Sequence, residues 1–421
     1  MARFHPGFTR RAHCLLAGGL TAAVCGVLIG EQELTRGGIF AAAIPLVAAV
    51  AVGRLRLTIS SSRRVEPARI TDGERAVVQL TITSTASLPI SSLMLQDTLP
   101  ARARGRARFV LDRFGPRQSR TVGYRLPPLH RGEHEIGPLH VRLSDPFGLI
   151  DRTRSFQARS RILVTPPVRP LADSSRVLAV GYGEGPGSSH IGVNGVDDLS
   201  TREYRDGDDR RKIHWRLSAR AGQLMVRQDE QPAPNDVVLL LDVRTEAHPL
   251  TGVLADETQP RRASFEWMLS AAASVGVHLV APQRPVVVLD SPGRPAAVRF
   301  TAAADLLAYL AVCEVRGDIG SEQVAELSGN FANQASVLAL LASPSVTMTR
   351  RLVERAATRG QRLAILIDGE AFGAGERPDL EPSAQLLRSA GWSVALAGPD
   401  DDVAAVWARL LADRHPLGAP R

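Results

Sequence analysis

Two long apolar runs lie close to the N-terminus of the chain. The first covers residues 12–30 and the second residues 37–53, with a short polar link at residues 31–36 between them. As helices they would rise about 26 to 28 Å, close to the hydrocarbon thickness of about 30 Å. Their repeated Gly and Ala residues suit close helix packing in lipid. The pattern predicts a transmembrane helical hairpin within residues 1–56.

Basic residues flank the two runs. They are Arg3, Arg10 and Arg11 before the first run, and Arg54, Arg56, Arg63 and Arg64 after the second. A signal peptide would also begin with basic residues, but its cleavage would leave the second run as an anchor. Under the positive-inside rule, the flanks place both ends of the hairpin on the cytoplasmic side. We expect a plasma (inner) membrane protein with two spans, whose N-terminus and C-terminal domains are cytoplasmic.

From residue 57 to residue 170, apolar and polar positions alternate along short segments. The alternation is regular at residues 78–82, 122–126 and 139–143, and shorter apolar runs occupy residues 93–95, 109–111 and 162–164. A period of two indicates strands with one buried and one exposed face. Six or seven such strands predict an antiparallel β-sandwich, which ends near Pro166, Pro167 and Pro170.

After residue 235 the pattern changes to continuous apolar runs that alternate with helical segments. Strands are expected at residues 237–241, 277–280, 286–289, 337–341, 363–367 and 394–397. Helices are expected at residues 262–274, 346–359, 383–390 and 401–413, and from residues 302 and 321 onward, with Gly276 near the C-cap of the first. Strands without a polar face are buried on both sides of a parallel sheet. Residues 235–421 are therefore predicted to form a doubly wound α/β domain.

Two acidic residues follow predicted strands of this sheet. Asp242 and Asp368 stand at carboxyl ends, where open α/β sheets bind their ligands. A carboxylate in that position can hold a divalent cation, or it can cap the loop that follows. The residues alone leave both interpretations open.

Composition narrows the classes of function. The chain has 421 residues, 44% of them hydrophobic and 22% charged, which suits several folded domains and is too polar for a many-span transporter. Its net charge of +8 comes almost entirely from Arg, with Lys212 as the only lysine, and aromatic residues make up 5%. Nucleic-acid binding would need basic residues clustered among aromatics, so no nucleic-acid partner is expected. The three cysteines have no neighbouring ligand or catalytic partner in sequence, and no cofactor is expected.

Residues 171–234, between the two modules, join a Gly-rich linker to the most densely charged part of the chain. The glycines at residues 181–187 lack a following helix pattern, so they indicate a linker and not a phosphate loop. The charged part, residues 200–227, contains both signs, so bidentate Arg–carboxylate pairs can neutralise most of it locally. Its candidate site residues are Arg202, Glu203, Tyr204, Arg205, Gly207, Asp208, Asp209, Arg211, His214, Trp215 and Arg220.

The pattern of this charged segment closely resembles the signature of the family called domain of unknown function 58. The stretch R-E-Y-R-x-G-D-D-x-R-x-I-H-W-R-x-S-A-R is followed, after a gap, by an apolar strand that ends in Asp242. The sequence Asp-Pro-Phe-Gly-Leu at residues 145–149 resembles a turn that the family carries late in its β region. The order of two spans, β region, signature and α/β domain is also similar.

The resemblance implies a C-terminal domain similar to von Willebrand factor type A domains. It also implies a MoxR-type AAA+ ATPase as a partner, together with other membrane proteins, and a role in assembling or maturing proteins at the membrane. We therefore expect a non-enzymatic, membrane-anchored adaptor. The alternative is a metal-assisted hydrolase that uses Asp242, Asp368 or the acidic residues 206–209, or a ligand-binding protein that uses the α/β domain. A binding module for anionic surfaces or nucleic acid through the Arg residues is a third hypothesis.

The metal-site motif that the resemblance implies is altered in this chain. The metal site of type A domains resembles D-x-S-x-S, but here Asp242 is followed by V-R-T-E, so that Arg244 and Glu246 take the two serine places. A guanidinium beside Asp242 would supply the positive charge that a cation otherwise supplies. Residues 343–345, Ser-Pro-Ser, stand where an acidic ligand is expected. We expect a degenerate site at Asp242 and Thr245 that holds no metal.

His214 and Trp215 are neighbours in the signature, and in a strand their side chains would face opposite ways. Trp215 is interpreted as a packing anchor. His214 is interpreted as a structural hydrogen-bonding residue, because no nucleophile with an orienting group accompanies it. The signature as a whole is either an internal clamp on the Gly-rich linker or a surface on which a partner docks.

Overall fold

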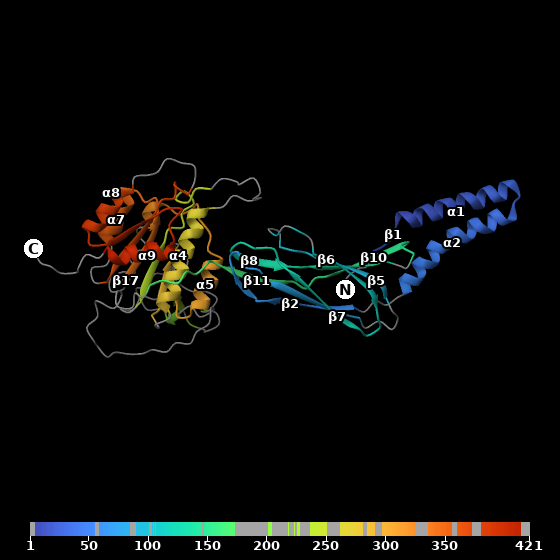
Figure 1. The fold of residues 1–421 in the computed structure, drawn as a ribbon, viewed down its shortest axis with the longest axis horizontal. Coiled ribbons are helices and arrows are strands. Elements are labelled where there is room, and N and C mark those ends of the chain that lie inside the picture. The colour runs from blue at the N-terminus through green and yellow to red at the C-terminus, as the bar shows by residue number, and fades with distance from the viewer. Residues whose placement is uncertain are drawn as a thin grey trace, which may run out of the picture. The chain divides into compact units, whose positions relative to one another are not determined.

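The two N-terminal apolar runs form an antiparallel pair of helices in the computed structural model, α1 (Arg10–Ile29) and α2 (Gln32–Arg54) (Figure 1). Both are long and apolar enough to cross a membrane. Gly30 ends α1 in a left-handed conformation with a φ of 80°, so the link between the helices is shorter than residues 31–36. A Cβ on Gly38 would lie 2.4 Å from the backbone nitrogen of Ala23, so glycine lets the two helices touch.

The chain divides into two units, Met1–Thr165 and Pro166–Arg421. The structure describes residues 5–54, 59–84, 90–100, 103, 105, 107–144, 147–172, 201–203, 218, 223, 225–227, 236–250, 262–280, 284–290, 297–324, 336–355, 360–372 and 380–413. The division falls at Pro166, the first of the prolines that end the predicted β region. Most of the linker and signature at residues 171–234 lies outside the described residues.

The β region of the first unit is a sandwich built from three small sheets. Strands β2 (Ile59–Glu66), β4 (Val77–Ser84) and β7 (Ser119–Arg125) form one of them. The second contains β1 (His5–Phe8), β5 (Ile90–Asp97), β6 (Ala107–Phe114), β9 (Leu139–Ser144) and β10 (Ile150–Phe156). The third contains β3 (Arg69–Thr71), β8 (Gly132–Ile136) and β11 (Ser160–Thr165). Leu80 of the first sheet shares a core with Leu93 of the second, and Val78 shares another with Ile162 of the third.

One strand of this sandwich precedes the helices in the chain, whereas the sequence pattern predicts only the hairpin within residues 1–56. β1 pairs antiparallel with β10, and Phe8 lies opposite Ile150. Thr9 is the single residue between β1 and α1. Its backbone N–H donates to the carbonyl of Leu149 at 2.9 Å, and its hydroxyl donates to the carbonyl of Gly148 at 2.7 Å. An edge strand of the sandwich therefore continues directly into the first membrane-length helix.

A buried charged cluster joins two sheets of the sandwich. Arg63 of β2 donates from Nε to Asp97 of β5 at 3.0 Å, and its Nη2 lies 2.5 Å from the other carboxylate oxygen. The hydroxyl of Tyr124 donates to the same carboxylate at 2.7 Å. The side chains of Arg63 and Asp97 are 5% and 0% exposed. Arg63 is therefore a core residue, and its predicted place among the charges that flank the membrane is wrong.

The second unit contains a six-stranded sheet that is parallel except at one edge. The order is β16 (Val298–Phe300), β15 (Val286–Leu289), β14 (Val237–Leu241), β17 (Ser336–Ala342), β18 (Arg362–Ile367) and β19 (Ser393–Ala397), with β16 antiparallel. The chain moves from β14 to β15 in one direction and from β17 to β19 in the other. The direction of winding therefore switches between β14 and β17, as in a doubly wound α/β sheet.

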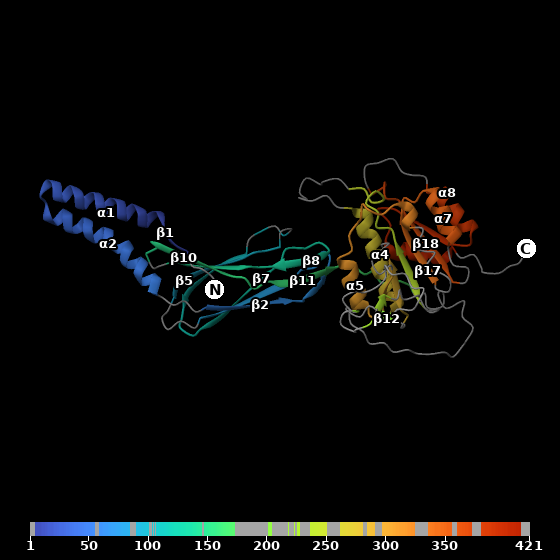
Figure 2. The same ribbon diagram turned by 180° about the vertical axis from the view of Figure 1, so that it is seen from behind.

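Five helices with described bounds surround this sheet (Figure 2). They are α4 (Ala263–Val280), α5 (Ala303–Ala311), α7 (Val346–Arg355), α8 (Glu381–Ser389) and α9 (Val403–Ala412). α4 contacts α5 and α9, and α7 contacts α8. Because right-handed crossovers in opposite directions lie on opposite faces, α4 and α7 cover different sides of the sheet.

The first of these helices is longer than the sequence predicts. α4 continues to Val280, so residues 277–280 are not a strand and Gly276 is not near a C-cap. A Cβ on Gly276 would lie 2.3 Å from a methyl carbon of Leu306, so the glycine allows the close approach of α5. α4 is also apolar enough to cross a membrane, but 72% of its most apolar window is buried inside this unit. A helix buried in this way has no polar face and therefore resembles a buried strand in sequence.

Candidate functional site

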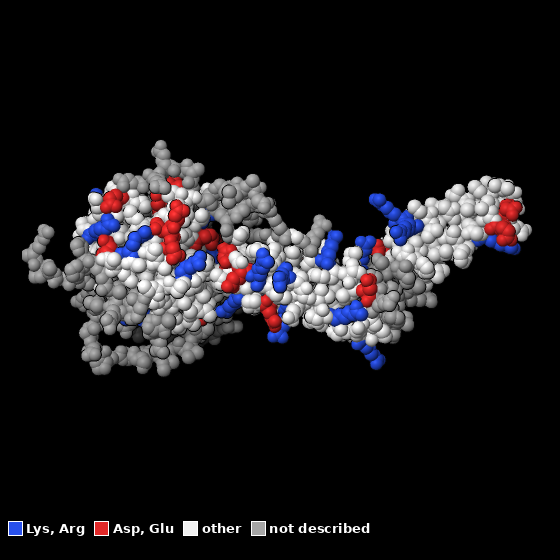
Figure 3. All heavy atoms as spheres, in the orientation of Figure 1, with Lys and Arg blue, Asp and Glu red and all other residues white. Residues whose placement is uncertain are grey.

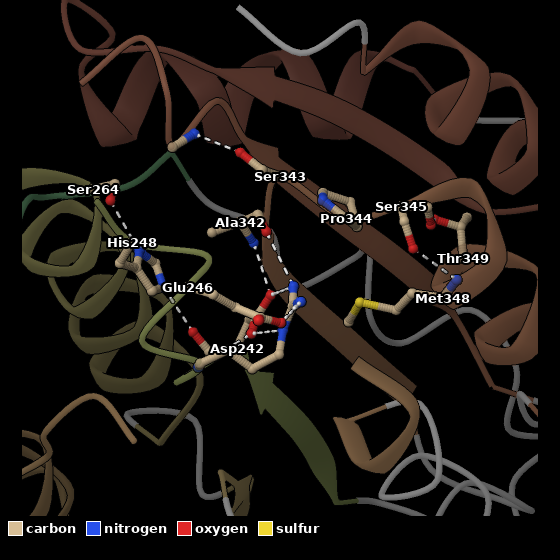
Figure 4. A network of polar contacts seen from close by, with 12 residues as sticks. Asp242, Glu246, His248, Ser264, Ala342, Ser343, Pro344, Ser345, Met348 and Thr349 are labelled. Atoms are coloured by element: carbon tan, nitrogen blue, oxygen red, sulfur yellow. Dashed lines mark hydrogen bonds and ion pairs between the residues drawn. The ribbon is translucent and has the colours of Figure 1, made fainter. Parts of the chain in front are cut away.

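The carboxyl ends of β14 and β17 meet at the switch point of the sheet, which is the position where open α/β sheets bind ligands. Asp242 follows β14 directly and is fully buried. Its carboxylate accepts hydrogen bonds from Nε and Nη2 of Arg244 at 2.8 and 2.7 Å, and from the backbone N–H of Ala342 at 3.2 Å (Figure 4). An arginine from the same loop therefore neutralises the acidic group at the switch point.

Arg244 is itself buried, with 5% of its surface exposed. Its Nη1 contacts Glu246 at 3.0 Å, and its Nη2 also donates to the carbonyl of Ala342 at 3.3 Å. Burial alone would lower the pKa of the guanidinium, but the hydrogen bonds and charges of Asp242 and Glu246 outweigh burial and raise that pKa. Arg244 therefore stays charged beside Asp242. The side chain of Glu246 is 69% exposed, so it links this buried pair to the surface.

A divalent cation at this position would need the oxygens that Arg244 occupies. Mg²⁺ and Ca²⁺ bind several oxygen ligands at once, but both carboxylate oxygens of Asp242 already accept from the guanidinium. Thr245 is held through its backbone: its N–H donates to the carbonyl of Arg316 at 2.8 Å, and its carbonyl accepts from Arg262 at 2.9 Å. Within the described part of the chain, no group of three or more His, Cys, Asp or Glu side chains is placed to hold a metal. The donor set around Asp242 therefore does not fit a bound cation.

The other polar residues at this edge of the sheet cap local structure. Oδ1 of Asp368 accepts from the backbone N–H of Ala371 at 2.9 Å, as the loop-cap interpretation requires. Ser343 has a left-handed φ of 42°, and its hydroxyl oxygen accepts from the N–H of Gly369 at 3.1 Å. The hydroxyl oxygen of Ser345 accepts from the N–H of Met348 at 3.2 Å, in the first turn of α7 (Figure 4). These hydrogen bonds shape the loops around Asp242.

A buried histidine that is not among the residues predicted from sequence supports the Asp242 loop. His248 is fully buried, and its Nε2 donates to the backbone carbonyl of Asp242 at 2.7 Å. A carbonyl only accepts, so Nδ1 is the acceptor for the Ser264 hydroxyl at 2.9 Å. Arg262 donates to the carbonyls of His248 and Thr245. In sequence, His248 is a histidine seven residues after the end of an apolar strand, and an exposed loop histidine would show the same pattern.

Acid is expected to destabilise the second unit through His248. Burial lowers its pKa below the ordinary value of 6.5, and the charges of Arg244 and Arg262 act in the same direction, although Asp242 opposes them. As the pH falls below about 6.5, the unfolded chain binds a proton at this histidine and the folded unit does not. The free energy of unfolding should therefore fall between about pH 7.5 and pH 5.

Thermal melting of the detergent-solubilised protein, followed by tryptophan fluorescence, measures this slope. The matched variant His248→Gln removes the titrating group and is expected to melt with a smaller dependence on pH than the wild type. Equal slopes for the two proteins would show that His248 does not carry the effect.

Of the charged signature at residues 200–227, the structure describes the two ends and, between them, Ser218 and Gln223. β12 (Thr201–Glu203) pairs antiparallel with β13 (Met225–Arg227), which places Arg202 opposite Val226 and Glu203 opposite Met225. This pairing brings the beginning and the end of the segment together. The other candidates lie outside the described residues, and they are Tyr204, Arg205, Gly207, Asp208, Asp209, Arg211, His214, Trp215 and Arg220.

The paired strands and the Asp242 loop are close together in the chain. Residues 200–256 match the family described as "Protein of unknown function DUF58". The DUF58 match therefore spans β12, β13, β14 and the loop that holds Asp242, Arg244 and His248. It covers the signature and the buried pair in a single stretch.

A curated relative supports the same family. The "Uncharacterized protein YeaD" of Bacillus subtilis (strain 168) is 27% identical over 243 residues, which cover 53% of this chain and 58% of YeaD. The chain thus spans a little more than half the length of this relative. Together, the DUF58 match and YeaD support a place in the DUF58 family.

Similarity to solved structures is weak. The CARDB domain of the PF1109 protein from Pyrococcus furiosus, solved in complex with di-metal ions, is 8% identical with a TM-score of 0.19, and the match covers 26% of this chain and 93% of that domain. The putative ApaA protein from Bordetella pertussis is 15% identical with a TM-score of 0.20, and the match covers 26% of this chain and 94% of ApaA. TM-scores this low do not establish a shared fold. The β-sandwich is therefore assigned from its own strand pairing and hydrophobic cores.

Proposed function

We propose that this chain is a non-enzymatic, membrane-anchored interaction protein that works as an adaptor for a MoxR-type AAA+ ATPase in the assembly or maturation of other proteins. The observation that carries the proposal is the buried ion pair of Asp242 and Arg244 at the switch point. An enzyme built on this type of sheet uses that position for its ligand and needs accessible polar groups there. In this chain the polar groups are paired with each other. The domain is therefore better suited to presenting a surface than to turning over a substrate.

The proposed partner class comes from the family resemblance. The DUF58 match at residues 200–256 supports that resemblance, and the antiparallel edge strand on a parallel sheet is consistent with a von Willebrand factor type A-like domain at residues 235–421. Type A domains with an intact D-x-S-x-S motif use a bound cation at this end of the sheet. Because Arg244 supplies the positive charge here, this chain would recognise its partner without a bridging metal.

We also propose that the hairpin anchors the chain in the plasma (inner) membrane, with the N-terminus and the C-terminal domains in the cytoplasm. α1 and α2 have the length and apolarity of two spans. Arg10 and Arg11 are exposed at the start of α1, whereas the other end of the hairpin carries Glu31 in the link and Glu33 in the first turn of α2, where Arg36 pairs with Glu33. This distribution of charge favours the proposed orientation under the positive-inside rule.

The adaptor proposal predicts that full-length protein, purified from gently solubilised membranes, captures an AAA+ ATPase that mass spectrometry identifies. The double variant Arg205→Ala, Asp208→Ala tests the signature as the docking surface. The control Glu322→Ala, Arg351→Ala removes an exposed ion pair elsewhere in the same unit. For a docking surface, the wild type and the control should capture the ATPase, and the signature variant should lose it.

Melting followed by tryptophan fluorescence distinguishes the two roles of the signature. A docking surface predicts an unchanged melting temperature for the signature variant, whereas an internal clamp predicts a lower one. An ATPase missing from all three preparations would contradict the adaptor proposal.

A further inference from the structure

Residues 147–149, the described part of the turn between β9 and β10, lie against the start of the helical hairpin (Figure 1). Thr9 bonds to the turn twice, through the carbonyls of Gly148 and Leu149. Apolar side chains complete the contact, and they are Ala12, Ile44, Ala48, Ala49, Leu149 and Ile150. Hydrogen bonds and packing together therefore hold this turn on both helices.

The position of the turn along the hairpin corresponds to the edge of a bilayer. From Ala12, the residue after Arg10 and Arg11, to Ile29, α1 rises about 26 Å, close to the hydrocarbon thickness of about 30 Å. The two arginines thus mark the headgroup layer. A Cβ placed on Gly148 would lie 3.6 Å from Nη1 of Arg11, so the turn lies at the same depth as this guanidinium.

Large apolar side chains are exposed at this depth. Phe147, beside Gly148 in the turn, is 70% exposed, and Phe8, the last residue of β1, is 40% exposed. Arg10 and Arg11 are exposed as well. Figure 3 shows basic side chains gathered at the base of the hairpin, whose surface between its two ends is mostly uncharged. Aromatic rings and basic groups at headgroup depth are the combination that anchors proteins in a membrane interface.

We propose that the β9–β10 turn is a second membrane contact, in which the ring of Phe147 enters the boundary between headgroups and acyl chains while Arg10 and Arg11 bind lipid phosphates. The occupant of this surface is the anionic phospholipid leaflet in which α1 begins, and the proposal rests on the proposed span of the hairpin. Because the same turn is bonded to Thr9 and packed on both helices, this contact fixes the height and tilt of the sandwich on the bilayer.

Quenching of tryptophan fluorescence by brominated acyl chains tests the contact. Full-length protein is reconstituted in vesicles of phosphatidylcholine and phosphatidylglycerol whose acyl chains are brominated near the headgroup. The probe is Phe147→Trp, and the wild-type signal is subtracted. All native tryptophans lie in the second unit, and they are Trp215, Trp267, Trp392 and Trp407.

Two further tryptophan variants serve as controls for the probe at position 147, one inside the membrane and one away from it. Leu20→Trp places the ring at an exposed position inside α1, and it reports whether the hairpin is in the bilayer. Val77→Trp places it at an exposed apolar position of β4. β2 begins at Ile59, just after the hairpin, and ends at Glu66, which pairs with Val77. Val77 therefore lies about 23 Å, the length of β2, from the membrane side of the sandwich.

The proposal expects quenching of Leu20→Trp and Phe147→Trp, and none of Val77→Trp. If Leu20→Trp is quenched and Phe147→Trp behaves like Val77→Trp, the second contact is wrong and the membrane anchor stands. If none of the three is quenched, the anchor and the contact both fail. Adding Arg10→Gln and Arg11→Gln should weaken the quenching at position 147, and unchanged quenching would overturn the assignment of lipid phosphates to these arginines.

Discussion

Replacing Arg244 with methionine is expected to lower the free energy of unfolding of the second unit by about 3–5 kcal/mol. The change leaves the buried Asp242 carboxylate without the two guanidinium hydrogen bonds at 2.8 and 2.7 Å. It also leaves the carbonyl of Ala342 without one donor. For a unit of this size the loss corresponds to a fall in melting temperature of roughly 10 °C. Fluorescence of the fully buried Trp392 and Trp407 follows the transition.

Two further variants separate the loss of the ion pair from the loss of side-chain volume. The double change Asp242→Asn, Arg244→Met removes both charges, so it should recover much of the stability that Arg244→Met loses. Arg388→Met removes an arginine whose ion pairs with Glu381 and Asp413 are solvent-exposed, and it should cost no more than about 1 kcal/mol. An Arg244→Met protein that melts with the wild type would show that the pair does not hold the loop.

The same ion pair determines the expected response to magnesium. Because Arg244 occupies both oxygens of Asp242, Mg²⁺ should leave the melting temperature of the wild type unchanged. A ligand that binds only the folded state raises the melting temperature in a saturable way. A saturable rise would therefore overturn the conclusion that these residues do not fit a cation.

In the first unit, Arg63→Met is expected to lower the free energy of unfolding of the sandwich by a similar amount, about 3–5 kcal/mol. Asp97 would lose its only positively charged partner in this cluster, and the carbonyls of Ile136 and Ala158 would lose donors at 3.0 and 3.1 Å. Burial, together with the hydrogen bond and charge of Asp97, raises the pKa of Tyr124, so this hydroxyl stays neutral. It cannot replace the missing positive charge.

Hydrogen exchange of the backbone amides of β4 and β7 measures this loss, because the first unit contains no tryptophan. The control is Arg159→Met, which removes an exposed ion pair with Glu135 in the same sandwich and should leave exchange almost unchanged. Equal exchange rates in Arg63→Met and in the wild type would contradict a stabilising role for the cluster.

The parallel strands of the second unit are the part of the fold that the sequence predicts best. The apolar runs at residues 237–241, 337–341, 363–367 and 394–397 all lie in strands of the sheet. A short continuous apolar run between helical patterns usually means a strand buried on both faces. The error at residues 277–280 has the same origin, because the buried end of α4 also lacks a polar face. The local sequence pattern does not distinguish a buried strand from a buried helical segment when tertiary contacts cover every side of the segment.

Other features depend on contacts that sequence spacing does not contain. β1, β3 and β16 have three or four residues each, too few to establish a period of two. Asp242 is found at the strand end where the pattern places it. The buried role of His248, however, depends on Ser264, which lies sixteen residues further along. Arg63 looks like a membrane flank in sequence and becomes a core residue only when β5 brings Asp97 beside it.

The early position of β1 in the chain affects both biosynthesis and protein engineering. Its partner β10 ends at Phe156, so β1 stays unpaired on the growing chain until both helices and β10 have been synthesised. A soluble fragment that begins after α2 removes this strand together with the anchor. Such a fragment leaves the edge of β10 with unpaired N–H and C=O groups, which form a template for pairing between copies. Self-association of the fragment would then reflect a missing strand and not an oligomer of the native protein.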